Sequence, residues 1–405
     1  MGTCLRRIGF LAAVLGLFVF PGHVPAQTDN DESYKAERQK AMELFNQNRH
    51  LEALPLFEAL AKKNPKDHQV LLGLAVGLVD EAATIEEDET AAAKERIRAR
   101  ELLLKARELG NNSTLLQNLL QLLPEDGIIK YENSPADRAM RAAEAAFAKR
   151  DFDEAIKNYS RVLETDPKNY SAVLYIGDSY FAKGDFANSA TWYERATRVD
   201  PDKETAFRYY ADQLTKNGDM EKAREMAIRA VVAEPYNPIT WRGLQQWAAA
   251  NHLELKRVHI NPHASSAQQD GKNVTISVDP NQSTEAMAAW IAYNGDRILW
   301  HNEKFAKQFP QEKQYRHSLA EEAEALGMAA RVWGETSKKE SSVPKDPDLA
   351  LCVKLAAAKM LEPYILLGGV DEGISRDYSA YREKNREKLV AYLSEFVVPP
   401  APAKK

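Results

Sequence analysis

Residue types that could carry chemistry gather in the last third of this 405-residue chain. Five of its eight histidines fall there or at its edge: His252, His259, His263, His301 and His317. Because histidine serves as a metal ligand and as a general base, these positions raise the hypothesis of a metal or hydrolytic site. His259 and His263 are four residues apart, but Pro262 lies between them in a strand-and-loop context. They therefore do not share a helix face, and we predict ordinary surface histidines.

Sequence motifs for catalysis are absent as well. The chain contains no His-Glu-x-x-His, Gly-x-Ser-x-Gly or Gly-x-x-x-x-Gly-Lys. His317 and Glu321 are one helical turn apart, but Ser318 and Glu321 form a capping-box pattern that leaves His317 just outside the helix. Cys352 lies between apolar neighbours, which predicts a buried small hydrophobe. We expect no catalytic residue, no metal and no cofactor.

The composition is that of a globular protein with two or three domains. Hydrophobic residues make up 44% and charged residues 28%, with a formal net charge of -5. General nucleic-acid binding requires a basic domain, so this balance argues against it. With only two cysteines, the chain has neither a disulfide scaffold nor a cysteine-based zinc site.

The N-terminus has the pattern of an export signal. Arg6 and Arg7 precede an apolar run over 8–20, and small residues stand where a cut after Ala26 requires them. We expect a signal peptide over 1–26, a linker over 27–33, and a periplasmic or secreted protein with no membrane span in the mature chain. The alternative is a short uncleaved anchor, although the apolar run is short for a span.

A fixed period of 34 residues organises the middle of the chain. Three gapless segments end at Pro167, Pro201 and Pro235, and other positions keep the same step. Such self-similarity is typical of stacked helix pairs. In the second segment, Gly184-Asp185 predicts a turn and 186–199 a second helix. One pair cannot bury its apolar stripe alone, so neighbouring pairs must stack.

This pattern resembles the tetratricopeptide repeat. The residues that carry the resemblance in the second segment are Gly177, Tyr180, Ser189, Tyr193, Ala196 and Pro201. The resemblance implies a mainly α fold, an α-solenoid of helix-turn-helix repeats. We expect a gapless array with a closing helix over 134–254, preceded over 34–127 by degenerate repeat-like units with an acidic insertion.

In this family the first helices of successive units line a concave groove that binds segments of partner proteins. Carried over position by position, the groove residues are Met140, Glu144, Phe147, Leu174, Asp178, Phe181, Arg208, Asp212 and Thr215. The Lys and Asn of members that clamp a terminal carboxylate are missing. A row of three carboxylates, one per unit, instead predicts a protein or peptide partner with basic groups.

Residues 255–396 predict a smaller, mostly helical α+β domain, followed by a Pro/Ala/Lys tail over 397–405. The alternation over 274–278 is typical of a strand, with 257–260 as its expected partner. Helices are expected over 283–309 with a break at Asn294-Gly295, over 318–333, over 349–367 and over 375–396, with a loop over 334–347.

These patterns favour an exported protein–protein interaction scaffold or adaptor that is not an enzyme. One alternative is an enzyme with a catalytic C-terminal domain whose repeats recruit substrate. Another is a structural envelope component that binds polysaccharide or outer-membrane proteins through Trp192, Trp290 or Trp300.

Overall fold

The computed structural model describes residues 32–85, 88–129, 134–262, 264–270, 273–278, 282–336, 346–369 and 371–401. The expected signal peptide over 1–26 and its cut after Ala26 lie outside these residues. The chain forms two compact units, residues 1–223 and 224–405, and each is described here by itself.

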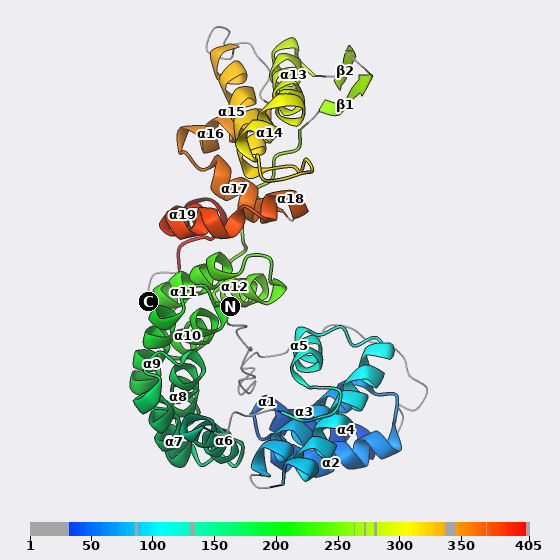
Figure 1. Ribbon diagram of the computed structural model, residues 1–405, viewed down its shortest axis with the longest axis vertical. Helices are drawn as coiled ribbons and strands as arrows, with labels where there is room; N and C mark the ends of the chain where they lie inside the picture. The colour runs from blue at the N-terminus through cyan, green and yellow to red at the C-terminus, as the bar shows by residue number, and fades with distance from the viewer. Residues whose placement is uncertain are drawn as a thin grey trace. The chain divides into compact units, whose positions relative to one another are not determined.

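Antiparallel helices make up the described part of the first unit (Figure 1). They are α1 (Glu32–Asn46), α2 (His50–Lys63), α3 (His68–Thr84), α4 (Glu89–Glu108), α5 (Thr114–Leu122), α6 (Pro135–Ala148), α7 (Phe152–Thr165), α8 (Tyr170–Ala182), α9 (Phe186–Val199) and α10 (Glu204–Lys216). The boundary between the units falls within α11 (Met220–Ala233). The expected helix-turn-helix units and the helix over 186–199 are confirmed.

The repeated aspartate begins each second helix. The side chains of Asp151, Asp185 and Asp219 accept hydrogen bonds from the backbone three residues later, at 3.2, 3.1 and 3.3 Å. Such caps satisfy one of the free N–H groups at a helix start. The residue before each aspartate has positive φ: 62° at Arg150, 77° at Gly184 and 79° at Gly218. The period therefore encodes a turn and a cap together.

Close packing within a unit depends on a missing side chain. A Cβ placed on Gly177 would lie 2.8 Å from Cδ1 of Tyr193, so the ring occupies the space that a larger residue would need. A similar contact occurs between successive units, because a Cβ on Gly73 of α3 would lie 2.4 Å from Cζ of Phe57 on α2. Tyr193 and Phe57 are fully buried. Gly177 therefore lets the two helices of its own unit approach closely.

The upstream units keep the repeat fold but depart from its lengths. Helices α3 and α4 have 17 and 20 residues, so the acidic insertion extends the helix pair on both sides of residues 86–87, which are outside the described part. Helix α6 contacts α3. The buried Arg96 bonds Glu89 at 2.6 Å and the carbonyl of Gly127 at 3.0 Å, which fixes the segment before α6.

The second unit combines helices with one two-stranded hairpin. After α12 (Pro238–Ala250), its elements are β1 (Ala264–Asp270), β2 (Asn273–Val278), α13 (Thr284–Leu299), the π-helical η1 (Trp300–Lys304), α14 (Phe305–Gln308), α15 (Leu319–Thr336), α16 (Pro347–Ala357), α17 (Leu361–Gly368), α18 (Glu372–Ser375), α19 (Tyr378–Tyr392) and the π-helical η2 (Leu393–Val397). No helix among the described residues is long and apolar enough to cross a membrane.

Three expectations for this unit were wrong in detail. The partner of β2 is β1, paired antiparallel with Asp270 opposite Asn273, and not 257–260. Pairing adjacent segments closes the shorter loop, and the polar sequence of β1 gave no alternation signal. The irregularity after α13 lies at 300–304, not at Asn294-Gly295. The helix over 349–367 is divided near Lys359, whose φ is 59°.

Helix α19 and the segment after it are bonded to the last repeat. The Tyr378 hydroxyl donates to the carbonyl of Val232 at 2.7 Å, and Arg382 donates to that of Ala233. Arg224 donates to three carbonyls, those of Ser394, Val398 and Pro399, each at 2.7 Å. The compact unit therefore begins at 224, earlier than the domain boundary expected after 254.

Candidate functional site

The expected groove residues lie on α6, α8 and α10. Figure 1 shows α8 and α10 on the inner side of the curved stack and α9 on the outer side. Among these residues, Glu144, Leu174, Asp178 and Phe181 are buried, and the others are half-buried. The positions therefore share one face, but its carboxylates are not a freely exposed row.

Asp178 is bonded within its own repeat. The hydroxyl of Tyr193 donates to Oδ1 of Asp178 at 2.6 Å, while the buried Oδ2 has no partner among the described atoms. Burial raises the pKa of Asp178 well above its usual range. The desolvation cost of a buried charge favours the protonated form, and this cost is the cause of the raised pKa.

Asp212, in the next repeat, faces cations of its own helix. Burial raises its pKa to about 7, against the opposing charges of Arg208 and Lys216. Arg208 is itself paired with Glu204 at 2.8 Å. Two of the three carboxylates of the row, Asp178 and Asp212, therefore interact with neighbouring groups of this chain. The expectation of a partner with basic groups stays a prediction.

A cavity of about 590 Å³ lies where the α1–α2 turn meets the inner side of α6, α8 and α10. Its lining residues are Asn46, Gln47, Asn48, Arg49, Glu52, Phe147, Arg150, Phe152, Asp178, Phe181, Ala182 and Lys216. Three of the expected groove residues are among them. The lining combines three phenylalanines with three cations, so one partly open cavity offers apolar surface beside positive charge.

The cations of this cavity differ in how far they are already paired. Arg49 binds both carboxylate oxygens of Glu52, at 2.7 and 2.5 Å. The Nη1 of Arg150 donates to the carbonyl of Gln47 at 3.3 Å, and its guanidinium lies over the ring of Phe152. Lys216 Nζ lies 4.6 Å from the ring centre of Phe181.

Sequence reasoning did not predict the cations at this cavity. Arg49 follows the turn position of its unit and Lys216 ends α10, so neither occupies a repeat position that the family resemblance marks. One signal was present: Arg150 stands 34 residues before Gly184, where the repeat has its turn glycine.

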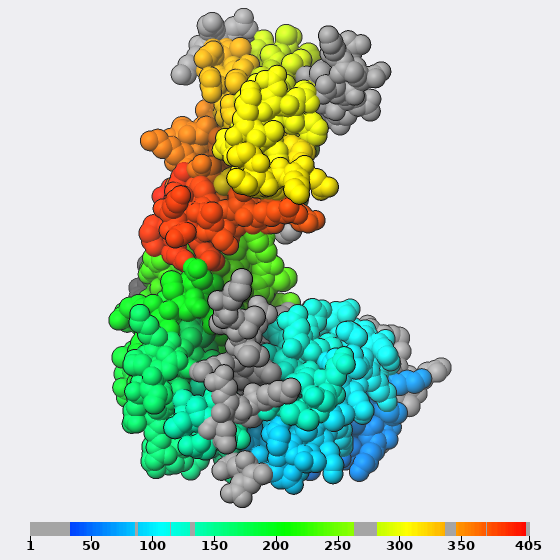
Figure 2. Space-filling view, in the orientation of Figure 1, coloured from blue at the N-terminus to red at the C-terminus, as the bar shows by residue number. Residues whose placement is uncertain are grey.

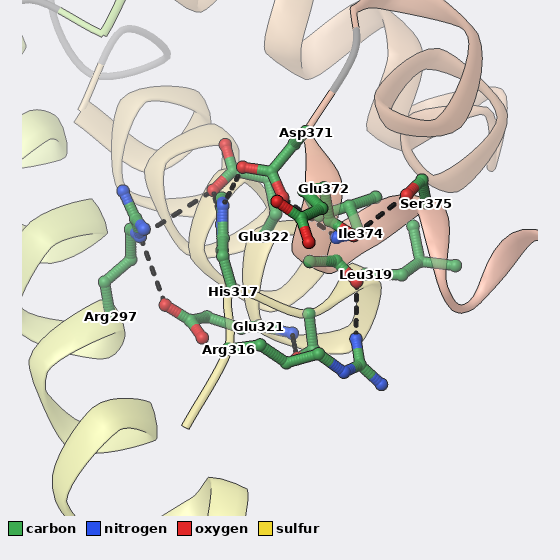
Figure 3. A network of polar contacts seen from close by, with 12 residues as sticks. Arg297, Arg316, His317, Leu319, Glu321, Glu322, Asp371, Glu372, Ile374 and Ser375 are labelled. Atoms are coloured by element: carbon green, nitrogen blue, oxygen red, sulfur yellow. Dashed lines mark hydrogen bonds and ion pairs between the residues drawn. The ribbon is translucent and has the colours of Figure 1, made fainter. Parts of the chain in front are cut away.

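A network of charged residues occupies the second unit (Figure 3). The two ring nitrogens of His317 face carboxylates, with Nδ1 3.1 Å from Asp371 and Nε2 2.9 Å from Glu322. Arg297 bonds Glu321 at 3.2 Å and lies 3.8 Å from Glu322. Burial lowers the pKa of His317, but the contacts with Glu322 and Asp371 outweigh it and leave that pKa raised.

The start of α15 is capped from two directions. Ser318 Oγ accepts from the backbone of Glu321 at 3.3 Å, as expected, while the carboxylate of Glu321 accepts from Tyr315 and Arg297. Asp377 accepts from the backbone of Leu319 at 2.9 Å. Only half of the expected capping box is present, because the Glu321 carboxylate accepts from Tyr315 and Arg297, while Asp377 satisfies a different backbone N–H, that of Leu319.

The neighbouring Arg316 bonds the segment before α15 to the start of α19. Its guanidinium binds both oxygens of Asp377, at 2.6 and 2.9 Å, and the carbonyl of Gly373 at 2.8 Å. In Figure 2 the side chains of α14 and the segment after it (yellow) meet those of α17–α19 (orange to red) on the face shown. The network therefore joins α15 to the turn before α19.

The chemistry of this network is mutual pairing. His317 was expected at the surface, but its side chain is only 20% exposed and both nitrogens face carboxylates. Among the described residues, no three His, Cys, Asp or Glu side chains are placed to hold a metal ion. Cys352 is fully buried, and burial raises its pKa to about 12, as expected for an unreactive thiol. The network therefore holds α13, α15 and the segment before α18 together.

The tryptophans do not form a surface for polysaccharide. Trp290 is fully buried and Trp300 nearly so, while Trp192 is half-buried with Arg195 over its ring. Stacking on a sugar needs an exposed ring. Trp290 and Trp300 are core residues, so they cannot bind polysaccharide in this way.

Comparisons with known proteins address the repeats. A family model described as tetratricopeptide repeat matches residues 38–94 and 140–204. No curated protein matches the chain. The chain is similar to MamA residues 41–end from Desulfovibrio magneticus RS-1, at 14% identity over 51% of this chain and 98% of that one, with a TM-score of 0.25.

Two further solved structures are similar at the same level. One is YrrB, described as a TPR protein with an unusual peptide-binding site, at 15% identity over 51% of this chain and 89% of that one, with a TM-score of 0.24. The other is the TPR2AB domain of yeast Sti1 in complex with pHSP90, at 14% identity over 54% and 98%, with a TM-score of 0.28. At these TM-scores the similarities carry no argument about this chain's partners.

Proposed function

We propose, from the premise that this chain carries tetratricopeptide repeats, that it is a protein–protein interaction scaffold whose inner helices bind a segment of another polypeptide. The observation that carries the proposal is the cavity on the inner side of α6, α8 and α10. Stacked helix pairs are preformed, so little conformational freedom is lost when a segment binds them.

The enzymatic alternative has no comparable observation in its favour. Its expected feature was a convergent set of ionisable groups in residues 255–395, and the groups around His317 do converge. They are bonded to one another, however, with both ring nitrogens of His317 facing carboxylates. A general base needs a nitrogen that can reach substrate, and the contacts of His317 with Glu322 and Asp371 support a structural role for it instead.

Site-specific photocrosslinking tests the scaffold proposal. A benzophenone amino acid replaces Thr215 on the inner helix α10, and a matched variant carries it at the exposed Thr191 on the outer helix α9. After irradiation in cells, we expect polypeptide adducts at position 215 and few at 191. Equal labelling at both positions, or none at 215, would contradict groove binding.

We further propose that the protein is exported and cut after Ala26. The supporting pattern is the charged, apolar and small-residue order over 6–26. N-terminal sequencing of protein recovered from each cell fraction is the test. The expected first residue in the exported fraction is Gln27; an intact N-terminus at Met1 in a membrane fraction would favour the uncleaved anchor.

A further inference from the structure

The strongest feature not used above is the charge of the cavity at the α1–α2 turn. Of its lining residues, Arg49, Arg150 and Lys216 are cationic, while Glu52 is neutralised by its two hydrogen bonds to Arg49. The remaining carboxyl group, Asp178, is buried and accepts a hydrogen bond from Tyr193, and burial raises its pKa. The lining thus holds three cations against two carboxyl groups, and one of the cations, Lys216, also faces Asp212 of its own helix.

The backbone at Arg150 adds an independent observation. Its φ of 62° lies in the left-handed region, which the later repeats fill with glycine at 77° and 79°. An L residue with a Cβ is strained there, and strain of this kind concentrates at functional positions. At this turn the chain carries an arginine whose side chain lines the cavity.

The apolar part of the lining favours a flat or branched hydrophobic group. Phe147 and Phe152 meet edge to face with ring centres 5.3 Å apart, and Phe181 lies under the ammonium of Lys216. The described hydrogen bond of the Arg150 guanidinium uses one nitrogen only, so further N–H groups can donate. The buried Oδ2 of Asp178 has no partner among the described atoms.

We infer that this cavity binds an acidic side chain of a partner polypeptide next to an aromatic residue, with Arg150 and Lys216 holding the carboxylate and Phe147, Phe152 and Phe181 the ring. The inference rests on the proposed function, because it names which segment of a partner the inner helices select. It predicts a partner of opposite charge to the one expected from the row of carboxylates.

Calorimetry with capped peptides tests the ligand chemistry. The probe is acetyl-Gly-Asp-Phe-Glu-Phe-Gly-amide, whose blocked ends leave only side-chain carboxylates. Its controls replace both acids by their amides, or by lysines. We expect the acidic peptide to bind at least tenfold more tightly than the amide version, and less tightly as salt rises. Equal binding of the amide peptide, tighter binding of the lysine peptide, or no binding of the acidic one would overturn the inference.

Two variants test the residues. Arg150→Gly removes the guanidinium while giving the turn the residue found in the later repeats, and Lys216→Met removes the charge while keeping a chain over Phe181. Each is expected to weaken binding at least fivefold. Arg198→Gln, which removes an exposed cation of α9 outside the cavity, is the matched control and should leave affinity unchanged.

The two proposals fail in different ways. If crosslinks at position 215 persist while Arg150→Gly and Lys216→Met bind the acidic peptide as the wild type does, the cavity inference is wrong and the scaffold proposal stands. If position 215 yields no polypeptide adduct in cells, the scaffold proposal is wrong whatever the peptides do. A free dicarboxylic acid that binds as tightly as the peptide would show a small-molecule site and overturn the inference.

Discussion

Single residues in this protein act through partners that are distant in sequence. His317 faces Glu322 on α15 and Asp371 before α18, with Arg297 opposing from α13. The close approach of Gly373 supports this arrangement, because a Cβ there would lie 2.4 Å from the carbonyl oxygen of His317. The charge state of one ring is therefore coupled to the joint between α15 and the turn before α19.

We expect His317→Gln to lose more stability in acid than in base. Because the folded-state pKa is raised, protonated His317 stabilises the fold fully below its unfolded pKa, and this contribution disappears as pH rises through the folded value. The loss of unfolding free energy should be about 1.5–3 kcal/mol at pH 5.5, the range of a hydrogen bond to a charged group. Urea unfolding at pH 5.5 and 8.5 measures it, and a loss that grows with pH would contradict the assignment.

Gly177→Ala is expected to destabilise the first unit by about 1–3 kcal/mol. Its Cβ would lie 2.8 Å from the buried ring of Tyr193, and an overpacked core must shift to accept it. Gly295→Ala is the control, since it lies in α13 with open space around the new atom. The Gly295→Ala change should raise the free energy of unfolding by roughly 0.5–1 kcal/mol, because alanine has the higher helix propensity. Similar effects of the two changes on thermal unfolding would refute the packing argument.

At the scale of elements, the repeat is a cap joined to a turn. The aspartates at 151, 185 and 219 begin the second helices, and the residue before each adopts positive φ. The degenerate first unit keeps the turn conformation with Asn48, whose φ is 54°. Asparagine tolerates this region better than most residues, which explains how the unit keeps its fold without glycine.

Exchanging residues at this turn should move stability in opposite directions. Gly184→Ala is expected to cost about 1 kcal/mol, because the left-handed conformation strains a Cβ even though no atom lies near it. Arg150→Gly relieves that strain and is expected to match the wild type or exceed it by up to about 1 kcal/mol. Chemical denaturation of both variants measures the difference. A large loss in Arg150→Gly would mean that its side-chain contacts outweigh the strain.

At the scale of the whole molecule, the second unit includes the last repeat helices. The carbonyls at the end of α11 accept from Tyr378 and Arg382 of α19. Terminal repeats need a partner for their exposed end, and α19 supplies it. A deletion of residues 136–250 would remove the array, but it would also remove the carbonyls to which α19 donates and so destabilise the C-terminal part. Point variants are therefore the better test of binding.

Arg224→Met is expected to destabilise the second unit by about 3–5 kcal/mol. The buried guanidinium donates to three carbonyls at the end of the chain, and its loss leaves them without that donor. Arg376→Met, which removes an exposed ion pair with Glu372, should change stability by no more than about 0.5 kcal/mol. Hydrogen exchange of the amides of α11 and η2 should be faster in Arg224→Met than in Arg376→Met. Equal protection in both variants would contradict the proposal that Arg224 holds the end of the chain against α11.

What the sequence determined by itself was local. The period of 34, the turn at Gly184-Asp185 and the helix over 186–199 all follow from residues a few positions apart, or from a repeated pattern. The helices over 318–333 and the strand over 274–278 were also visible in this way, with errors at their ends.

Only the tertiary structure decided the partners. Gln47 and Arg150 meet across 103 positions, and Asp377 caps a helix that begins 58 residues earlier. The carboxylates at 178 and 212 were visible in the sequence, but their burial and their partners were not. A carboxyl group's charge depends on its solvation and its neighbours. Those are set by packing between elements, which periodicity does not encode.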